Sequence, residues 1–89
     1  MIQAFDSTPD RTFPAFLIWL RRQYNRQDEV GGFAQRLRDD IELARLAGEP
    51  VRLTTFSGMD RRLRDEIGID EEMWATRERA GREFNTITA

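Results

Sequence analysis

The sequence contains no cysteine, no histidine and no lysine, and each absence narrows the functions open to it. Without cysteine there are no disulfides, thiolate metal sites or cysteine nucleophiles, so a chain of 89 residues must be held together by packing alone. Without histidine the chain lacks the commonest transition-metal ligand and the side chain most often used for proton transfer near neutral pH. We therefore expect a protein that is not an enzyme and that has no catalytic residues, no cofactor and no metal site.

Long apolar runs are also missing. No segment approaches the ~20 consecutive apolar residues needed to cross a bilayer, and the opening stretch MIQAFDSTPD has neither a basic leader nor an apolar signal core. The sequence thus predicts a cytoplasmic protein without a membrane partner.

The charged residues that are present make up 34% of the chain, and all fourteen basic residues are arginine. Two explanations remain open: guanidinium groups that bind carboxylates or phosphates in a bidentate way, or a genome whose base composition favours arginine codons. The arginines are spread over every segment and the formal net charge is -2, which favours the second explanation. This charge also argues against strong nonspecific binding of nucleic acid.

Hydrophobic residues recur at spacings of three and four in several segments, as expected for helices that pack on a common core. Asp28 and Asp70 are placed as N-caps, while Gly48 with Pro50, and later Gly68, supply stop signals. We expect helices over residues 13–25, 29–47, 58–67 and 71–84, preceded by a lead-in arm of residues 1–12. The predicted fold class is all-α: one domain over residues 1–89, a small four-helix bundle with a short extended N-terminal arm.

Residues 51–56, VRLTTF, alternate enough to resemble a β-strand. A single short strand needs a partner to complete its ladder, and the sequence offers none. We interpret the segment as an extended connector, although the sequence by itself leaves strand and connector open.

The residues around Gly68 have the outline of a DNA-binding helix-turn-helix, because a glycine-containing turn joins two helices there. However, Arg64 falls where the first helix usually needs a small residue, and Arg77 falls on the inner face of the second. Glu71 and Glu72 would meet phosphates at the end that enters the groove. We therefore expect an ordinary helical hairpin.

Apolar residues off the main stripes are the first functional clue. Ile18, Trp19, Leu43 and Leu46 lie beside or opposite those stripes, and aromatic anchors are favoured at protein contacts. A bundle that packs helices on more than one side would also use such residues. We predict from them a partner surface, with the core interpretation as the alternative.

Arginines near the end of the first helix are the second clue. Arg21, Arg22 and Arg26 form a candidate edge for binding phosphates or acidic groups, although a solvated helix face is the plainer explanation. The rival function that this edge suggests is a nucleic-acid-associated protein, DNA-binding or regulatory, that also uses Arg61 and Arg62.

An ordered set of residues in the first two helices resembles a known family. An aromatic residue, a Trp-Leu pair, a glutamine, a basic residue, an aspartate and a Val-Gly followed by alanine recur here as Phe16, Trp19, Leu20, Gln23, Arg26, Asp28, Val30, Gly31 and Ala34. This pattern, over residues 16 to about 40, resembles the YozE-type SAM-like family of small bacterial helical proteins. The resemblance implies an all-helical bundle distantly like a sterile alpha motif, with no established activity. Gly32 and Phe33 depart from the Asp-Leu expected there, and the second helix is longer than in the family.

Together these features predict a non-catalytic helical module for protein–protein interaction. Its partner is expected to be another protein or a second copy of the chain, and no small-molecule substrate is expected.

Overall fold

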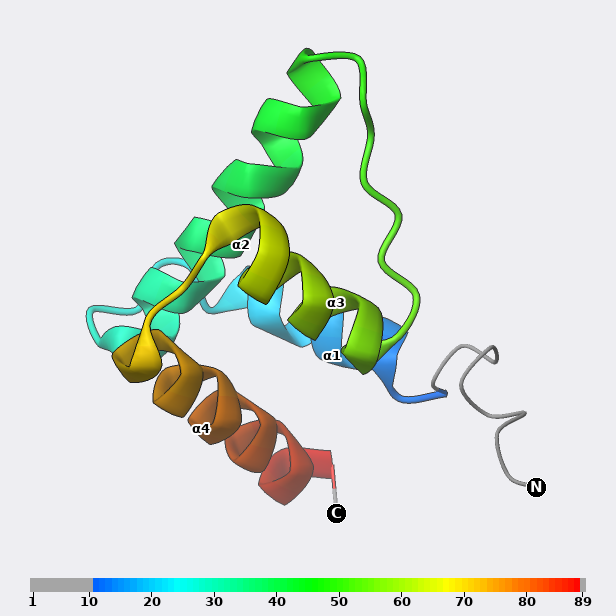
Figure 1. Ribbon diagram of the computed structural model, residues 1–89. Coiled ribbons are helices and arrows are strands. Elements are labelled where there is room, and N and C mark those ends of the chain that lie inside the picture. The colour runs from blue at the N-terminus through cyan, green and yellow to red at the C-terminus, as the bar shows by residue number, and fades with distance from the viewer. Residues whose placement is uncertain (1–10, 89) are drawn as a thin grey trace, which may run out of the picture.

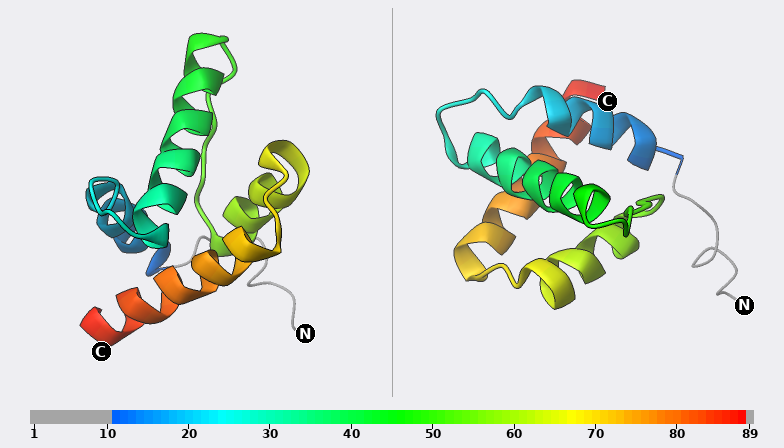
Figure 2. Two further views of the ribbon diagram at one scale, coloured as in Figure 1. Left: turned by 90° about the vertical axis from the view of Figure 1, so that its left-hand side faces the viewer. Right: turned by 90° about the horizontal axis from the view of Figure 1, so that it is seen from above.

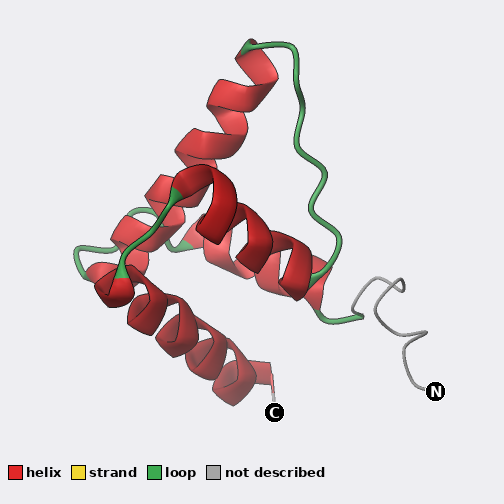
Figure 3. Ribbon diagram, in the orientation of Figure 1, coloured by secondary structure: helices red, strands yellow, loops and turns green. Residues whose placement is uncertain are grey.

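The computed structural model describes residues 11–88, and within that range the chain forms helices joined by loops, without a strand (Figures 1 and 3). The elements are α1 (Phe13–Arg22), α2 (Glu29–Leu46), α3 (Phe56–Arg62), a π-helical turn η2 (Leu63–Ile67) that continues α3, and α4 (Glu71–Thr88). The predicted all-α fold with four helices is therefore confirmed.

Two of the caps that the sequence indicates are present. The Asp28 carboxylate accepts a hydrogen bond from the Gly31 amide at the start of α2, and the Asp70 carboxylate accepts one from Met73 at the start of α4. Gly68 ends η2 in the left-handed conformation, with φ of 69°, which a residue without a side chain adopts most readily.

Three helix ends differ from the expected ones by two residues or more, and α2 ends at Leu46, one residue before its expected end. α1 ends at Arg22, before residue 25, because two successive turns, Gln23 to Leu20 and Arg26 to Gln23, carry the chain round the corner. α3 begins at Phe56, before residue 58, because the hydroxyl of Thr55 accepts a hydrogen bond from the Gly58 amide and so caps the helix at this earlier position. α4 continues past residue 84 to Thr88.

The start of the chain was also interpreted as a lead-in arm, residues 1–12. That arm lies outside the described residues except for Arg11 and Thr12. Thr12 precedes α1, and its side chain makes no capping hydrogen bond with the first turn of that helix.

Aromatic rings form the centre of the core where the helices meet. Phe16 of α1 is fully buried, and its ring centroid lies 5.1 Å from that of Phe56 and 5.4 Å from that of Phe84. Phe13 lies 5.0 Å from Phe56 in an edge-to-face arrangement, which aromatic pairs favour. The cluster therefore joins α1, α3 and α4 through one set of contacts.

α2 is only half covered by this core. Its buried residues, Val30, Gly31, Phe33, Ala34 and Leu37, all lie in its first half, and the second half projects away from the other helices (Figure 1). Residues 47–55, here called the connector, return from the free end of α2 to the start of α3 as an extended loop (Figure 1). Figure 2 shows α1 and α3 on opposite sides of α2.

The corner between α1 and α2 depends on a close backbone approach. Gly31 is buried, and a Cβ atom built on it would lie 2.2 Å from the backbone oxygen of Arg26. No side chain fits at that distance without moving the backbone. The neighbouring Gly32 is exposed, and a Cβ atom there would meet nothing within 4 Å.

We expect Gly31→Ala to lower the free energy of unfolding by about 2–4 kcal/mol, because the methyl group must push apart the corner and the first turn of α2. Gly32→Ala is the matched control on the same helix, and it should raise stability by about 0.5–1 kcal/mol through better helix propensity. Urea denaturation of the two variants measures both effects. Equal changes in the two variants would contradict the close approach.

Candidate functional site

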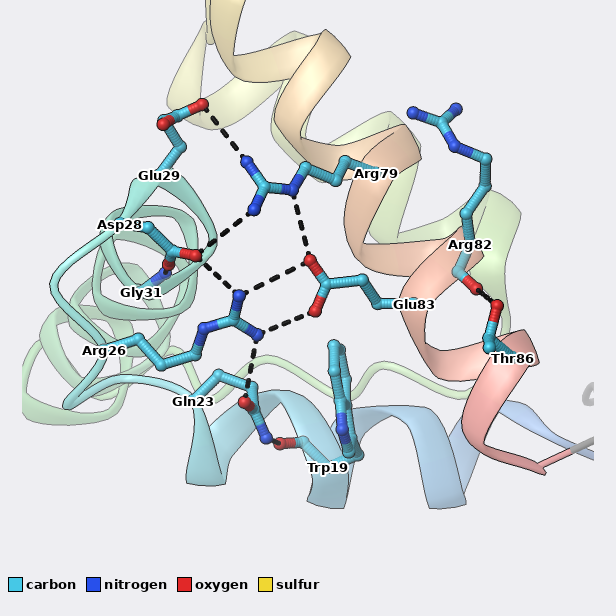
Figure 4. A network of polar contacts seen from close by, with 10 residues as sticks. All are labelled: Trp19, Gln23, Arg26, Asp28, Glu29, Gly31, Arg79, Arg82, Glu83 and Thr86. Atoms are coloured by element: carbon cyan, nitrogen blue, oxygen red, sulfur yellow. Dashed lines mark hydrogen bonds and ion pairs between the residues drawn. The ribbon is translucent and has the colours of Figure 1, made fainter.

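A network of ion pairs surrounds the corner and joins it to α4 (Figure 4). The guanidinium of Arg26 binds the carboxylate of Asp28 at 2.6 Å and that of Glu83 at 2.8 Å. Arg79 contacts the same two carboxylates, at 3.3 Å to Asp28 and 3.1 Å to Glu83. Two residues from the corner are thus linked to two residues of α4, which lie more than fifty positions later in the sequence.

The network also extends back into α1. Arg26 donates to the side-chain oxygen of Gln23 at 3.3 Å, and the amide group of Gln23 donates to the backbone oxygen of Trp19 at 2.9 Å (Figure 4). Hydrogen bonds from Arg26 are the main cause that lowers the pKa of Asp28 and the pKa of Glu83 below their ordinary values. These polar groups are satisfied by one another, so the network fixes the helices.

Two further ion pairs join neighbouring helices. Arg62 of α3 binds Asp40 of α2 at 2.6 Å, and Arg77 of α4 binds Asp60 of α3 at 2.7 Å. The guanidinium of Arg77 also lies over the Phe56 ring, 5.6 Å from its centroid. Arg77 therefore packs inside the hairpin around Gly68, as the sequence indicated when it argued against a DNA-reading unit.

The three arginines of the predicted edge, Arg21, Arg22 and Arg26, differ in their contacts. Arg21 and Arg22 are exposed and make no ion pair with any described residue, whereas Arg26 is held by carboxylates in the network. Of the two other arginines that a nucleic-acid function would use, Arg61 is exposed, and Arg62 is paired with Asp40. The phosphate-binding interpretation thus loses Arg26 and Arg62 as free groups.

The four predicted contact residues do not form one surface. Trp19 packs against Phe16 and Phe84, with ring centroids 5.9 Å and 5.8 Å away, so the core accounts for it. Ile18 is 54% exposed on α1. Leu43 and Leu46 are still more exposed and belong to the last turn of α2, whose second half projects away from the other helices (Figure 1).

A groove of about 590 Å³ lies between α1, the middle of α2 and the connector. Its apolar lining comes from all three elements and consists of Leu17, Leu20, Ala34, Leu37, Ile41, Val51 and Leu53. The remaining lining residues are Arg21, Arg38, Glu42, Arg52 and Thr54. The groove therefore has an apolar floor and a polar rim, the usual composition of a binding cleft.

The rim of the groove carries more positive than negative charge, with three arginines and one glutamate. Arg21, Arg38 and Arg52 are exposed and form no ion pair within residues 11–88. The one rim carboxylate, Glu42, is bound by Arg45 on the solvent side of α2. Arg38 also lies over the ring of Tyr24, 4.8 Å from its centroid, so a cation–π contact engages this guanidinium. Three guanidinium groups without a carboxylate partner among the described residues thus lie beside the apolar floor.

Sequence reasoning identified only Arg21 among these groove residues as a functional candidate. Arg38 and Arg52 had no local signal, because their convergence depends on how the connector folds back beside α2. The alternation of VRLTTF was a partial signal, since Val51 and Leu53 are both half-buried and line the groove, while Arg52 and Thr54 are exposed.

The part of the chain that the structure describes contains no cluster of three or more acidic side chains arranged to hold a metal ion. No helix among those residues is long and apolar enough to span a membrane. No protein-family model, no curated protein and no solved structure matches this chain. The resemblance to the YozE-type family therefore stays a prediction, and the residues that carry it, among them Gln23, Arg26, Asp28 and Gly31, have structural roles at the corner.

We expect Trp19→Ala to lower the free energy of unfolding by about 2–3 kcal/mol, because the ring fills the space between Phe16 and Phe84. Ile18→Ala, one position earlier and mostly exposed, should change it by less than about 0.5 kcal/mol. Thermal and urea unfolding of both variants would decide. A Trp19 variant as stable as the wild type would show that the ring is a surface group.

Acid should weaken the network around Arg26. The pKa of Glu83 is lower in the folded chain than in the unfolded chain, so the unfolded chain binds more protons at acid pH. The contribution of ionised Glu83 to the free energy of unfolding is therefore complete above about pH 4.3. It is lost as the pH falls through the lower pKa of the folded state. We expect Glu83→Gln to reduce the loss of stability on acidification. The measurement is urea denaturation at a series of pH values.

The matched control is Glu78→Gln, which changes an exposed carboxylate on the same helix that has no ion pair with a described residue. This control should lose stability in acid as steeply as the wild type. If the two glutamine variants had the same acid dependence, the contribution of Glu83 would be refuted.

Proposed function

We propose that this chain is a non-catalytic protein–protein interaction module and that the groove between α1, α2 and the connector is its contact site. The observation that carries the proposal is the combination, in one place, of an apolar floor and three arginines without ion pairs. Apolar contact area supplies binding energy, and charged groups at the edge supply orientation and selectivity.

The second half of α2 supports the same function. This helix continues past the core with Leu43 and Leu46 exposed at its free end, near Ile41 and Glu42 of the groove in sequence. The apolar side chains of this arm stay in water and gain no burial energy unless something covers them. A protein partner or a second copy of the chain would cover it.

The nucleic-acid alternative is supported less well. A phosphate-binding surface needs several free arginines on one face, and Arg26 and Arg62 are already bound to carboxylates. The apolar floor of the groove also matches a peptide better than a phosphate backbone.

An affinity-capture experiment tests the proposal with three immobilised forms of the full chain. They are the wild type, a groove variant carrying Arg21→Glu and Arg52→Glu, and a control carrying Arg22→Glu and Arg61→Glu. The control changes the same number of exposed arginines outside the groove lining, so both variants alter the net charge equally.

We expect one or more proteins, or added free chain, to be retained by the wild type and the control but lost from the groove variant. Circular dichroism should show that all three forms fold alike. Equal retention by all three, or retention that nuclease treatment abolishes, would refute the proposed site.

A further inference from the structure

The connector contains a short segment with unused backbone hydrogen-bonding groups. None of the backbone N–H and C=O groups of residues 51–54 bonds to another residue within the described range. The segment is extended (Figure 1). Alternate side chains along it, those of Val51 and Leu53, are the half-buried ones. It thus has the side-chain pattern of a strand without the ladder that a strand normally completes.

The position of this segment lets a ligand in the groove reach the backbone N–H and C=O groups of residues 51–54. Residues 51–54 form one wall of the groove, and the apolar floor lies directly beside them. A second extended segment in the groove would place alternate side chains on that floor and its backbone alongside the connector. Peptides bind to exposed strands in other proteins by this addition of a strand.

The arginines around the groove favour acidic side chains in such a bound segment. Arg52 lies on the connector itself, while Arg21 and Arg38 lie on the two helices across the groove. All three lack ion pairs within residues 11–88, so a bound segment with carboxylates would meet guanidinium groups from both sides.

The same charge disfavours a second copy as the occupant. Symmetric pairing of two connectors would bring two copies of Arg52 into one short two-stranded ribbon and set both arginine rims close together. Residues 51–54 contain no acidic side chain that would offset this repulsion.

We propose that the groove binds an extended acidic segment of another protein, with apolar side chains at every second position, which pairs as a β-strand with residues 51–54 of the connector. This inference rests on the proposed function, because it names the partner chemistry of the same groove. It goes further by stating the conformation of the bound segment and the backbone that it contacts.

A displayed library of random twelve-residue peptides, selected on the immobilised full chain, tests the chemistry. We expect the enriched sequences to contain aspartate or glutamate together with apolar residues at alternate positions. The best one is then synthesised with a fluorescent label, and its affinity is measured by anisotropy.

Two sets of changes test the contacts. The groove variant with Arg21→Glu and Arg52→Glu should bind the peptide at least about tenfold more weakly, whereas the control with Arg22→Glu and Arg61→Glu should stay within about threefold of the wild type. Two versions of the peptide carry N-methyl groups on alternate amides, one on each edge. Since only one edge can pair with the connector, one version should lose at least about tenfold in affinity and the other much less.

The outcomes separate this inference from the function on which it rests. Enriched peptides with helical spacing, or without acids, that still fail to bind the groove variant would overturn the strand inference and leave the groove as a protein-binding site. Equal affinity of both methylated peptides would also overturn the strand inference while leaving the groove as a protein-binding site. No enrichment, or peptides that bind the groove variant as well as the wild type, would overturn both. If the double variant does not fold, Arg52→Gln alone replaces it.

Discussion

The fold depends on how Arg26 is held at the corner between α1 and α2. Its backbone oxygen lies so close to Gly31 that no side chain fits there, and its guanidinium bridges Asp28 and Glu83. A planar fork can bind two carboxylates at once, which the single ammonium group of a lysine does less well. This one residue therefore fixes the angle between α1 and α2 and the approach of α4. The direction of the projecting half of α2, and with it the groove, follows from that angle.

Local rules were sufficient for much of the helical pattern and insufficient for the contacts between helices. Asp28, Asp70 and Gly68 could be assigned from the sequence because their capping bonds join residues only three to five positions apart. By contrast, the pairing of Arg26 with Glu83 spans 57 positions, and no local pattern marks it. The start of α3 differs from the expected residue 58 for a smaller reason: serine and threonine both cap helices well, and at Thr55 the cap coincides with tertiary packing of Phe56.

The candidate site could be anticipated only in part, because the sequence shows where an apolar stripe runs but not what covers it. The stripe of α2 continues beyond Leu37 to Ile41, yet the last turns of the helix project away from the other helices (Figure 1). The connector lies there instead, and the space left between them is the groove. For Trp19 the sequence suggested an available side chain where the structure has a packed one. It lies off the main stripe of α1 and looked available, but α4 crosses at that flank and its Phe84 packs on the ring.

The distribution of the arginines gives the groove its significance. Where arginines lie between helices, as do Arg62, Arg77 and Arg79, the structure supplies each with a carboxylate. Water can solvate an exposed guanidinium at no cost to folding, so unpaired arginines elsewhere on the surface need no explanation. Three of them around one apolar floor differ from that background, because a ligand covering the floor would also exclude water from the rim. Their interaction with its charges would then strengthen as the local dielectric falls. Apolar burial and charge recognition are therefore coupled in this groove, and a partner that offered only one of them would gain little.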